Sequence, residues 1–132
     1  QNNRSQLIRK GNLKIIMDAY NANPTSMQAS LKSFLTDNLE DNYLILGDML
    51  ELGDYSKQEH KAILELISSL KPKDVFLVGS AFSQFAEEYN FNFFSDVMEL
   101  NAFLEKEPIK NGNVLIKGSR GIKLENTLEY LS

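Results

Sequence analysis

Short apolar runs rich in β-branched and aromatic residues alternate along this chain with longer amphipathic segments, and this alternation limits the folds open to it. The runs lie at residues 13–17, 43–47, 75–79, 91–94 and 114–118 (LKIIM, YLILG, VFLVG, FNFF and VLIKG). Their near-continuous hydrophobicity is typical of strands buried on both faces, and their alternation with helical segments is typical of repeated strand–helix units. The sequence therefore predicts an α/β fold: a three-layer, Rossmann-like open sheet, mostly parallel, with helices on both faces.

The segments between these runs carry recognisable helix starts. Asn23 followed by Pro24 predicts an N-cap and a first helical residue. The sequence SKQE at 56–59 predicts a capping box, and Asp96 with Glu99 predicts a further capped start. In the helix that follows SKQE, apolar residues recur at spacings of three and four and are expected to cover one face of the sheet. These expected core residues are Ile63, Leu64, Ile67 and Leu70.

Length and composition bound the domain organisation and exclude several classes of site. A chain of 132 residues, 42% of them hydrophobic, predicts a single domain over residues 1–132, with only the first ten or so residues as a connector. Because the net charge is -4 and the basic residues are scattered, nucleic acid is not an expected partner. The absence of cysteine and the single histidine exclude a disulfide framework, a thiolate zinc site and a His-rich metal cluster. No membrane span or signal core is found, so an intracellular soluble domain is expected.

Three polar loops follow strand runs, and ligands of open α/β sheets bind beyond the carboxyl ends of the strands. The first loop, DAYNANPTS at 18–26, offers the Asp18 carboxylate for ribose hydroxyls and the Tyr20 ring as an aromatic face. The amides of Asn21 and Asn23 can both donate and accept hydrogen bonds. This pattern is compatible with a ligand site, and equally with a turn in which the two asparagines only shape the chain and cap the helix.

The second loop, GDMLELGDYS at 47–56, carries three carboxylates. Asp48, Glu51 and Asp54 are suited to an ammonium group, to a magnesium ion with its waters, or simply to solvent. His60 lies in the helix that follows and has no obvious nucleophile or metal partner in the sequence. It is expected in a structural or surface role, with orientation of this loop as the functional alternative.

The third loop, KGSRG at 117–121, sets Ser119 and Arg120 between two glycines, ahead of a helical segment at 124–131. Backbone amides, a hydroxyl and a planar guanidinium form a candidate receptor for a carboxylate or a phosphate. The phosphate-loop pattern G-x-x-x-x-G-K-[ST] and the pattern G-x-G-x-x-G occur nowhere in the chain. A fourth candidate is Arg4 in NRSQ, near the entry to the domain, where a lone arginine is usually a surface residue.

Taken in order, the sequences NRSQ, MDAYNANPTSM, LGDMLELGDYSKQEH and LIKGSRGIKLE resemble the C-terminal domain of the Mur ligases over essentially the whole chain. Other members carry a histidine-containing form of the first loop, so YNANP resembles the member that adds D-alanyl-D-alanine to UDP-N-acetylmuramoyl-tripeptide. The resemblance implies a three-domain, ATP-dependent, amide-forming ligase of peptidoglycan synthesis in the bacterial cytoplasm. In such a ligase ATP phosphorylates the substrate carboxylate, and the dipeptide amine attacks the acyl phosphate.

The resemblance also implies roles for the candidate residues. Those that would face the nucleotide are Arg4, Asp18, Tyr20, Asn21 and Asn23. Those that would face the dipeptide are Asp48, Glu51, Ser119 and Arg120. The acids suit the ammonium end of the dipeptide, and the Ser–Arg pair suits its carboxylate end. The family often has a second acid where this chain has Met17, which leaves Asp18 to carry that role alone.

The resemblance further implies that this chain is a fragment, lacking the N-terminal domain and the central ATP-binding domain. ATP and Mg²⁺ would serve the full-length enzyme, while the fragment would hold neither tightly and would be inactive alone. Two alternatives stay open at this point: a stand-alone flavodoxin-like or Rossmann-like nucleotide-binding module, and a purely structural interaction domain. Neither accounts for the three loops together.

Overall fold

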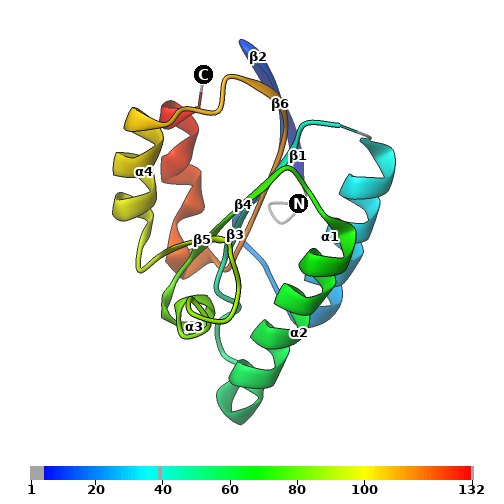
Figure 1. Ribbon diagram of the computed structural model, residues 1–132, viewed down its shortest axis with the longest axis vertical. Helices are drawn as coiled ribbons and strands as arrows, with labels where there is room; N and C mark the ends of the chain where they lie inside the picture. The colour runs from blue at the N-terminus through cyan, green and yellow to red at the C-terminus, as the bar shows by residue number, and fades with distance from the viewer. Residues whose placement is uncertain (1–4, 39, 132) are drawn as a thin grey trace.

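A single sheet with strand order β1-β2-β6-β3-β4-β5 runs through the molecule, and helices cover both of its faces (Figure 1). The structure, a computed structural model, describes residues 5–38 and 40–131. The strands are β1 (Gln6–Lys10), β2 (Asn12–Asp18), β3 (Asn42–Gly47), β4 (Asp74–Val78), β5 (Asn92–Phe94) and β6 (Asn111–Lys117). The helices are α1 (Pro24–Asp37), α2 (Ser56–Leu70), α3 (Ser80–Ser83) and α4 (Val97–Lys106), with 3₁₀ helices η1 (Gly53–Tyr55), η2 (Arg120–Ile122) and η3 (Leu124–Tyr130).

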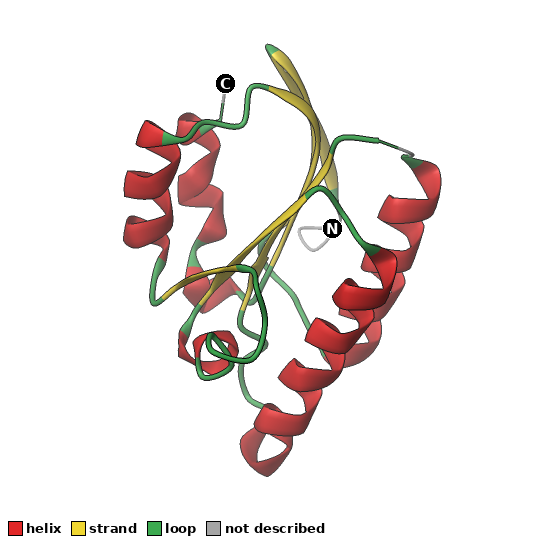
Figure 2. Ribbon diagram, in the orientation of Figure 1, coloured by secondary structure: helices red, strands yellow, loops and turns green. Residues whose placement is uncertain are grey.

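The helices divide between the faces because the chain crosses the sheet in two directions. All neighbouring strands pair in parallel except β1 and β2, which pair antiparallel. The chain first moves from β2 outward to β5, with α1 and α2 on one face, and then returns through α4 on the other (Figure 2). Since parallel crossovers are right-handed, reversing the direction of travel moves the crossover helix to the opposite face. The returning strand, β6, enters between β2 and β3. The predicted mostly parallel α/β fold is confirmed.

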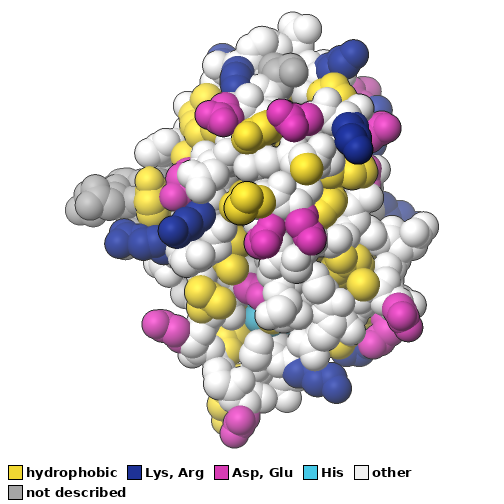
Figure 3. All heavy atoms as spheres, turned by 90° about the vertical axis from the view of Figure 1, so that its left-hand side faces the viewer, with side chains coloured by type: hydrophobic (Ala, Val, Ile, Leu, Met, Phe, Trp, Pro, Cys, Tyr) yellow, Lys and Arg dark blue, Asp and Glu magenta, His cyan; other side chains and the backbone are white. Residues whose placement is uncertain are grey.

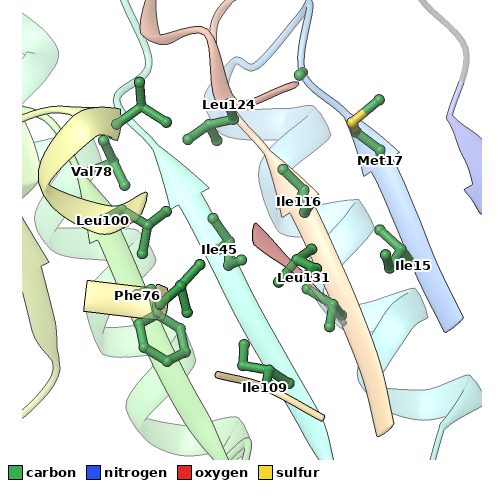
Figure 4. Close-up of a cluster of buried hydrophobic side chains, with 14 of the residues drawn as sticks. Ile15, Met17, Ile45, Phe76, Val78, Leu100, Ile109, Ile116, Leu124 and Leu131 are labelled. Carbon is green, nitrogen blue, oxygen red and sulfur yellow. The ribbon is translucent and has the colours of Figure 1, made fainter. Parts of the chain in front are cut away.

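Side chains alternate between two apolar clusters, one on each face of the sheet. Leu44 and Leu46 of β3 face α1 and α2, whereas Ile45 between them faces α4 and η3. Figure 4 shows the second cluster, in which Ile15, Ile116, Ile45 and Phe76 come from four strands that are neighbours in the sheet. Both faces of the central strands are therefore buried, which explains why their sequences are apolar throughout. The expected core residues Ile63, Leu64 and Ile67 of α2 are fully buried in the cluster on the α1 and α2 face, and Leu70 packs against that cluster.

Two of the predicted helix starts are confirmed. The Asn23 side chain accepts a hydrogen bond of 2.8 Å from the Ser26 amide, with Pro24 as the first helical residue. The Asp96 side chain likewise accepts one of 3.0 Å from the Glu99 amide. These caps satisfy amides that a helix leaves without an internal partner in its first turn.

Two expectations about local structure were wrong. Ser56 is not the N-cap of a capping box: it is the first residue of α2, because η1 runs directly into that helix. The first residues are not only a connector either, since β1 pairs along β2 as an antiparallel edge strand. Leu7 on β1 is 57% exposed, so this strand lacks the continuous apolar signal of the buried strands.

The ends of β3 and β6 approach so closely that glycine is required at the contact. A Cβ atom on Gly118 would lie 2.9 Å from the Leu124 Cδ1 and 3.0 Å from the Cα of Gly47. The second of these atoms is backbone and cannot move aside by a change of rotamer. The Gly47–Gly118 contact therefore fixes how the two strand ends meet.

We expect Gly118→Ala to lower the free energy of unfolding by about 1–3 kcal/mol, the usual range for overpacking a well-packed site. Urea denaturation of the purified chain measures this change. Gly121→Ala is the matched control, since its new methyl group would meet only the end of the flexible Leu50 side chain, at 3.1 Å. Equal stabilities for the two variants would contradict the tight approach of the strand ends.

Candidate functional site

The loops after β2, β3 and β6 meet at one edge of the sheet, because these strands are parallel neighbours. They enclose a cavity of about 210 Å³. Its lining combines the three polar loops that the sequence indicated as ligand sites: Tyr20, Asn21, Ala22, Leu50, Glu51, Ser119, Arg120 and Gly121. The structure therefore brings five of the candidate residues, Tyr20, Asn21, Glu51, Ser119 and Arg120, to one small site.

Hydrogen bonds fix the third loop to the second. The Ser119 amide donates to the Asp48 carbonyl at 3.2 Å, and the Ser119 hydroxyl accepts from the Leu50 amide at 2.9 Å. Because Ser119 uses both its backbone and its side chain in this way, the position of Arg120 is set relative to Glu51. These two exposed residues carry opposite charges on the wall of the same cavity.

Glu51 occupies this wall in a conformation that side chains rarely adopt. Its φ is +66°, in the left-handed region that favours glycine. A non-glycine residue in this region costs on the order of 1 kcal/mol or more, and such costs persist where the surroundings determine the conformation. The adjacent Leu50–Ser119 hydrogen bond and the turn into η1 supply those surroundings.

A buried ion pair joins the third loop to the first. The Lys117 ammonium donates to one carboxylate oxygen of Asp18 at 2.7 Å and to the Asn21 carbonyl at 3.1 Å. Lys117 is only 1% exposed, so Asp18 is the counter-ion that makes burial of its charge tolerable. The other carboxylate oxygen of Asp18, Oδ1, is buried and has no hydrogen-bond partner among residues 5–38 and 40–131. Above this pair, the Arg120 guanidinium lies 5.4 Å from the centroid of the Tyr20 ring, in cation–π geometry.

Lys117 is a member of the site that the sequence patterns did not reveal. It ends the otherwise apolar run of β6, directly opposite Asp18 in the parallel register with β2. A lysine at the end of a buried strand, paired across the sheet with an acid at the end of its neighbour, was the available signal. Without knowing that β6 and β2 are neighbours, the two residues could not be paired.

Asp48 does not line the cavity but holds the start of α3. Its two carboxylate oxygens accept hydrogen bonds from the Ala81 amide at 2.8 Å and the Phe82 amide at 3.0 Å. Asp48 is 3% exposed and lies against Gly79, where a Cβ atom would fall 2.3 Å from the carboxylate. Both oxygens are therefore engaged inside the protein, and the dipeptide-facing position expected for Asp48 is not observed.

His60 is buried beneath the second loop and supports its backbone. Its Nε2 accepts a hydrogen bond from the Met49 amide at 3.0 Å, and its Nδ1 lies 2.7 Å from the Ser56 carbonyl. Since Nε2 accepts and a carbonyl can only accept, the proton lies on Nδ1 and the ring is neutral. Two further candidates lie apart from the cavity lining, since Asn23 caps α1 and Asp54 is exposed in η1. Arg4 falls outside the described residues.

The described residues also bear on three other kinds of partner: metal ions, membranes and charged macromolecules. Within residues 5–38 and 40–131, no three His, Cys, Asp or Glu side chains are grouped to hold a metal ion. No helix in the same residues is both long and apolar enough to cross a membrane. On the face that carries α4, basic, acidic and apolar side chains are interspersed, and no single charge dominates the view (Figure 3).

The architecture is that of an open α/β domain with a loop cavity at the carboxyl ends of its parallel strands, where such domains bind ligands. Residues 3–120 match the family described as Mur ligase, glutamate ligase domain. The chain therefore belongs to the Mur ligase family, as the C-terminal domain of those enzymes. This membership favours a ligase domain over the binding-module and interaction-domain alternatives.

Individual relatives agree with the family. A UDP-N-acetylmuramoyl-tripeptide–D-alanyl-D-alanine ligase of Bacillus subtilis is 37% identical, over 97% of this chain and 30% of its own length. A ligase of the same name from Rickettsia prowazekii is 32% identical, over 96% of this chain and 29% of its own length. The chain thus spans less than a third of the relatives it matches.

Solved structures agree as well. A crystal structure of MurF from Acinetobacter baumannii superposes with a TM-score of 0.84 at 31% identity, covering 98% of this chain and 29% of that one. MurF from Thermotoga maritima in complex with ADP gives a TM-score of 0.79 at 25% identity, over 97% of this chain and 30% of that one.

We expect Asp48→Asn to lower the free energy of unfolding by about 1.5–3 kcal/mol, because an amide retains one acceptor oxygen and loses the charge that strengthens both bonds. Thermal or urea denaturation of the purified chain measures the loss. Asp54→Asn, in the exposed part of the same loop, is the control and should change stability little. Unchanged stability of Asp48→Asn would make Asp48 a ligand-facing candidate again.

Proposed function

We propose that this domain serves a full-length, ATP-dependent ligase that joins D-alanyl-D-alanine to UDP-N-acetylmuramoyl-tripeptide in peptidoglycan synthesis, in the bacterial cytoplasm. The observation that carries the proposal is the meeting of the YNANP, LGDMLELG and KGSRG loops around one cavity, in a chain of the Mur ligase family. The similarity to ligases of this name and to a MurF bound to ADP supports the choice of substrates.

In this proposal the dipeptide is held through its two charged ends. Arg120 can bind a carboxylate with two parallel hydrogen bonds, and Ser119 holds the Arg120 backbone in place. Glu51, across the cavity, suits the ammonium group that must become the attacking amine. Asp48 is not assigned to the amine, because its carboxylate accepts hydrogen bonds from two amides of α3. Glu51 is therefore the single acid of this loop that we assign to the amine.

The loop after β2 faces the nucleotide in the proposal. Tyr20 offers a ring for stacking, and the exposed Asn21 and Asn23 amides can bind polar groups of the adenosine. One carboxylate oxygen of Asp18 has no partner within the described part of the chain, so a ribose hydroxyl can supply a donor once that buried oxygen becomes accessible. Arg4 is assigned to the phosphates or ribose by the family resemblance alone.

The central domain supplies the rest of the chemistry in this proposal. The triphosphate needs a phosphate loop and Mg²⁺, and the phosphate-loop pattern is absent from this sequence. Forming an amide through an acyl phosphate also needs an oriented amine and exclusion of water. Closure of this domain over the central domain would provide both, with the loop cavity facing the reacting groups.

We expect two substitutions in the full-length ligase to raise the KM of different substrates. Arg120→Lys should raise the KM for D-alanyl-D-alanine and largely spare that for ATP, because lysine cannot reproduce a bidentate contact. Asn21→Ala should raise the KM for ATP by roughly two- to tenfold, the equivalent of about 0.5–1.5 kcal/mol for one lost hydrogen bond. Steady-state kinetics with each substrate varied separately distinguishes them.

Asn90→Ala, in the exposed loop before β5, is the matched control for the asparagine and should behave as the wild type. If Arg120→Lys changed only the ATP constant, KGSRG would be a phosphate-facing loop, and the dipeptide would have to bind elsewhere.

We also expect residues 1–132 to fold alone as a stable monomer and to show neither ligase nor ATPase activity. The two apolar clusters lie within the described residues, and the chemistry of the triphosphate is assigned to another domain. Circular dichroism, sedimentation and a phosphate-release assay on the purified chain test the three statements. ATP turnover that persists through repeated purification would contradict the assignment of the phosphates to the central domain.

A further inference from the structure

The ammonium of Lys117 occupies a position that the proposed reaction does not explain. It is buried at the junction of the two loops assigned to different ligands, where a charge is costly unless fully paired. Its bonds to Asp18 and to the Asn21 carbonyl both reach the loop after β2. Yet Lys117 is itself the last residue of β6, directly before the Gly118-Ser119-Arg120 segment.

The connection is made twice, once by a buried side chain and once on the wall of the cavity. The buried Lys117 binds the Asp18 side chain and the Asn21 backbone carbonyl of the first loop. On the wall, the Arg120 guanidinium packs over the Tyr20 ring at 5.4 Å. The first loop therefore cannot shift relative to β6 without breaking a buried ion pair, and its shift would also change the contact surface of Arg120.

The two carboxylate oxygens of Asp18 differ in their hydrogen bonding. Lys117 donates to one carboxylate oxygen, at 2.7 Å, and the other is buried with no donor among the residues that the structure describes. A buried acceptor without a donor is unfavourable, so a ligand that supplies a donor to Oδ1 stabilises Asp18 and the loop that it begins. Lys117, bonded to Asp18 and directly before the Gly118-Ser119-Arg120 segment, links this change to the start of the KGSRG loop.

We propose that Lys117 is a positioning residue that couples the two ligands: it ties the nucleotide-facing loop to the dipeptide-facing loop, so that occupation of one favours occupation of the other. The inference rests on the proposed function, because that function assigns the loops to their ligands. Coupling between two sites is a difference in binding free energy and must act equally in both directions. It is therefore measurable as one ratio of dissociation constants.

The experiment uses the full-length ligase with saturating UDP-N-acetylmuramoyl-tripeptide and Mg²⁺. Isothermal calorimetry measures the Kd of a non-hydrolysable ATP analogue, with and without saturating D-alanyl-D-alanine. In the wild type the dipeptide should tighten binding of the analogue by about fivefold or more, the lower end of typical coupling between sites. In Lys117→Met this ratio should fall to about one, while Lys117→Arg, which keeps the charge, should retain part of it.

Two further variants separate coupling from simple stability. Asp18→Asn combined with Lys117→Met replaces the buried ion pair by a neutral pair of similar size, which removes the unpaired charge that the single variant would leave. This double variant should melt closer to the wild type than Lys117→Met does, yet still show a ratio of about one. Lys106→Met, on the exposed surface of α4, should keep the wild-type ratio.

A wild-type ratio of one, or a double variant that binds both ligands with the wild-type ratio, would overturn the coupling. Failure of the proposed function looks different. In that case Arg120→Lys would leave the Kd of the dipeptide unchanged, or the wild type would bind neither ligand.

Discussion

The entry of β6 between β2 and β3 is the constraint on which the candidate site depends. It makes neighbours of two strand ends that are far apart in the sequence, Asp18 and Lys117, and it leaves so little room beside β3 that Gly47 and Gly118 touch. Because β6 forms late in the chain, the cavity is complete only when the last crossover has been made. A ligand at this edge therefore contacts elements from both ends of the domain.

Two polar side chains buried near this edge accept hydrogen bonds from backbone amides. Asp48 supplies acceptors to the first amides of α3, and neutral His60 supplies an acceptor to the Met49 amide. Such groups are costly when unpaired and specific when paired, so they determine one arrangement of the loops. The exposed residues Glu51 and Arg120 are carried by loops whose backbone these hydrogen bonds hold.

The sequence predicted the strands, the parallel sheet and the two capped helices because periodicity and capping are local properties. It also predicted which loops line the cavity, since the loops that leave the carboxyl ends of parallel strands all reach the same edge of the sheet. It could not predict the role of Asp48 or Lys117, because each depends on a partner on another element: α3 for Asp48 and β2 for Lys117. β1 was missed for a related reason, as an edge strand is defined by its pairing and not by a continuous apolar run.

The contact between Gly47 and Gly118 also limits how this edge can change during evolution. The space beside Gly47 is filled by Ile122 and Leu124, which lead from the KGSRG loop back to the core, and the space beside Gly118 by Leu124 and the backbone of Gly47. A larger residue at position 47 therefore requires smaller ones at 122 and 124, whereas at position 118 no smaller side chain removes the clash with the Gly47 backbone. Across relatives position 118 should stay glycine while positions 47, 122 and 124 vary together, a constraint that the exposed residues Glu51 and Arg120 do not share.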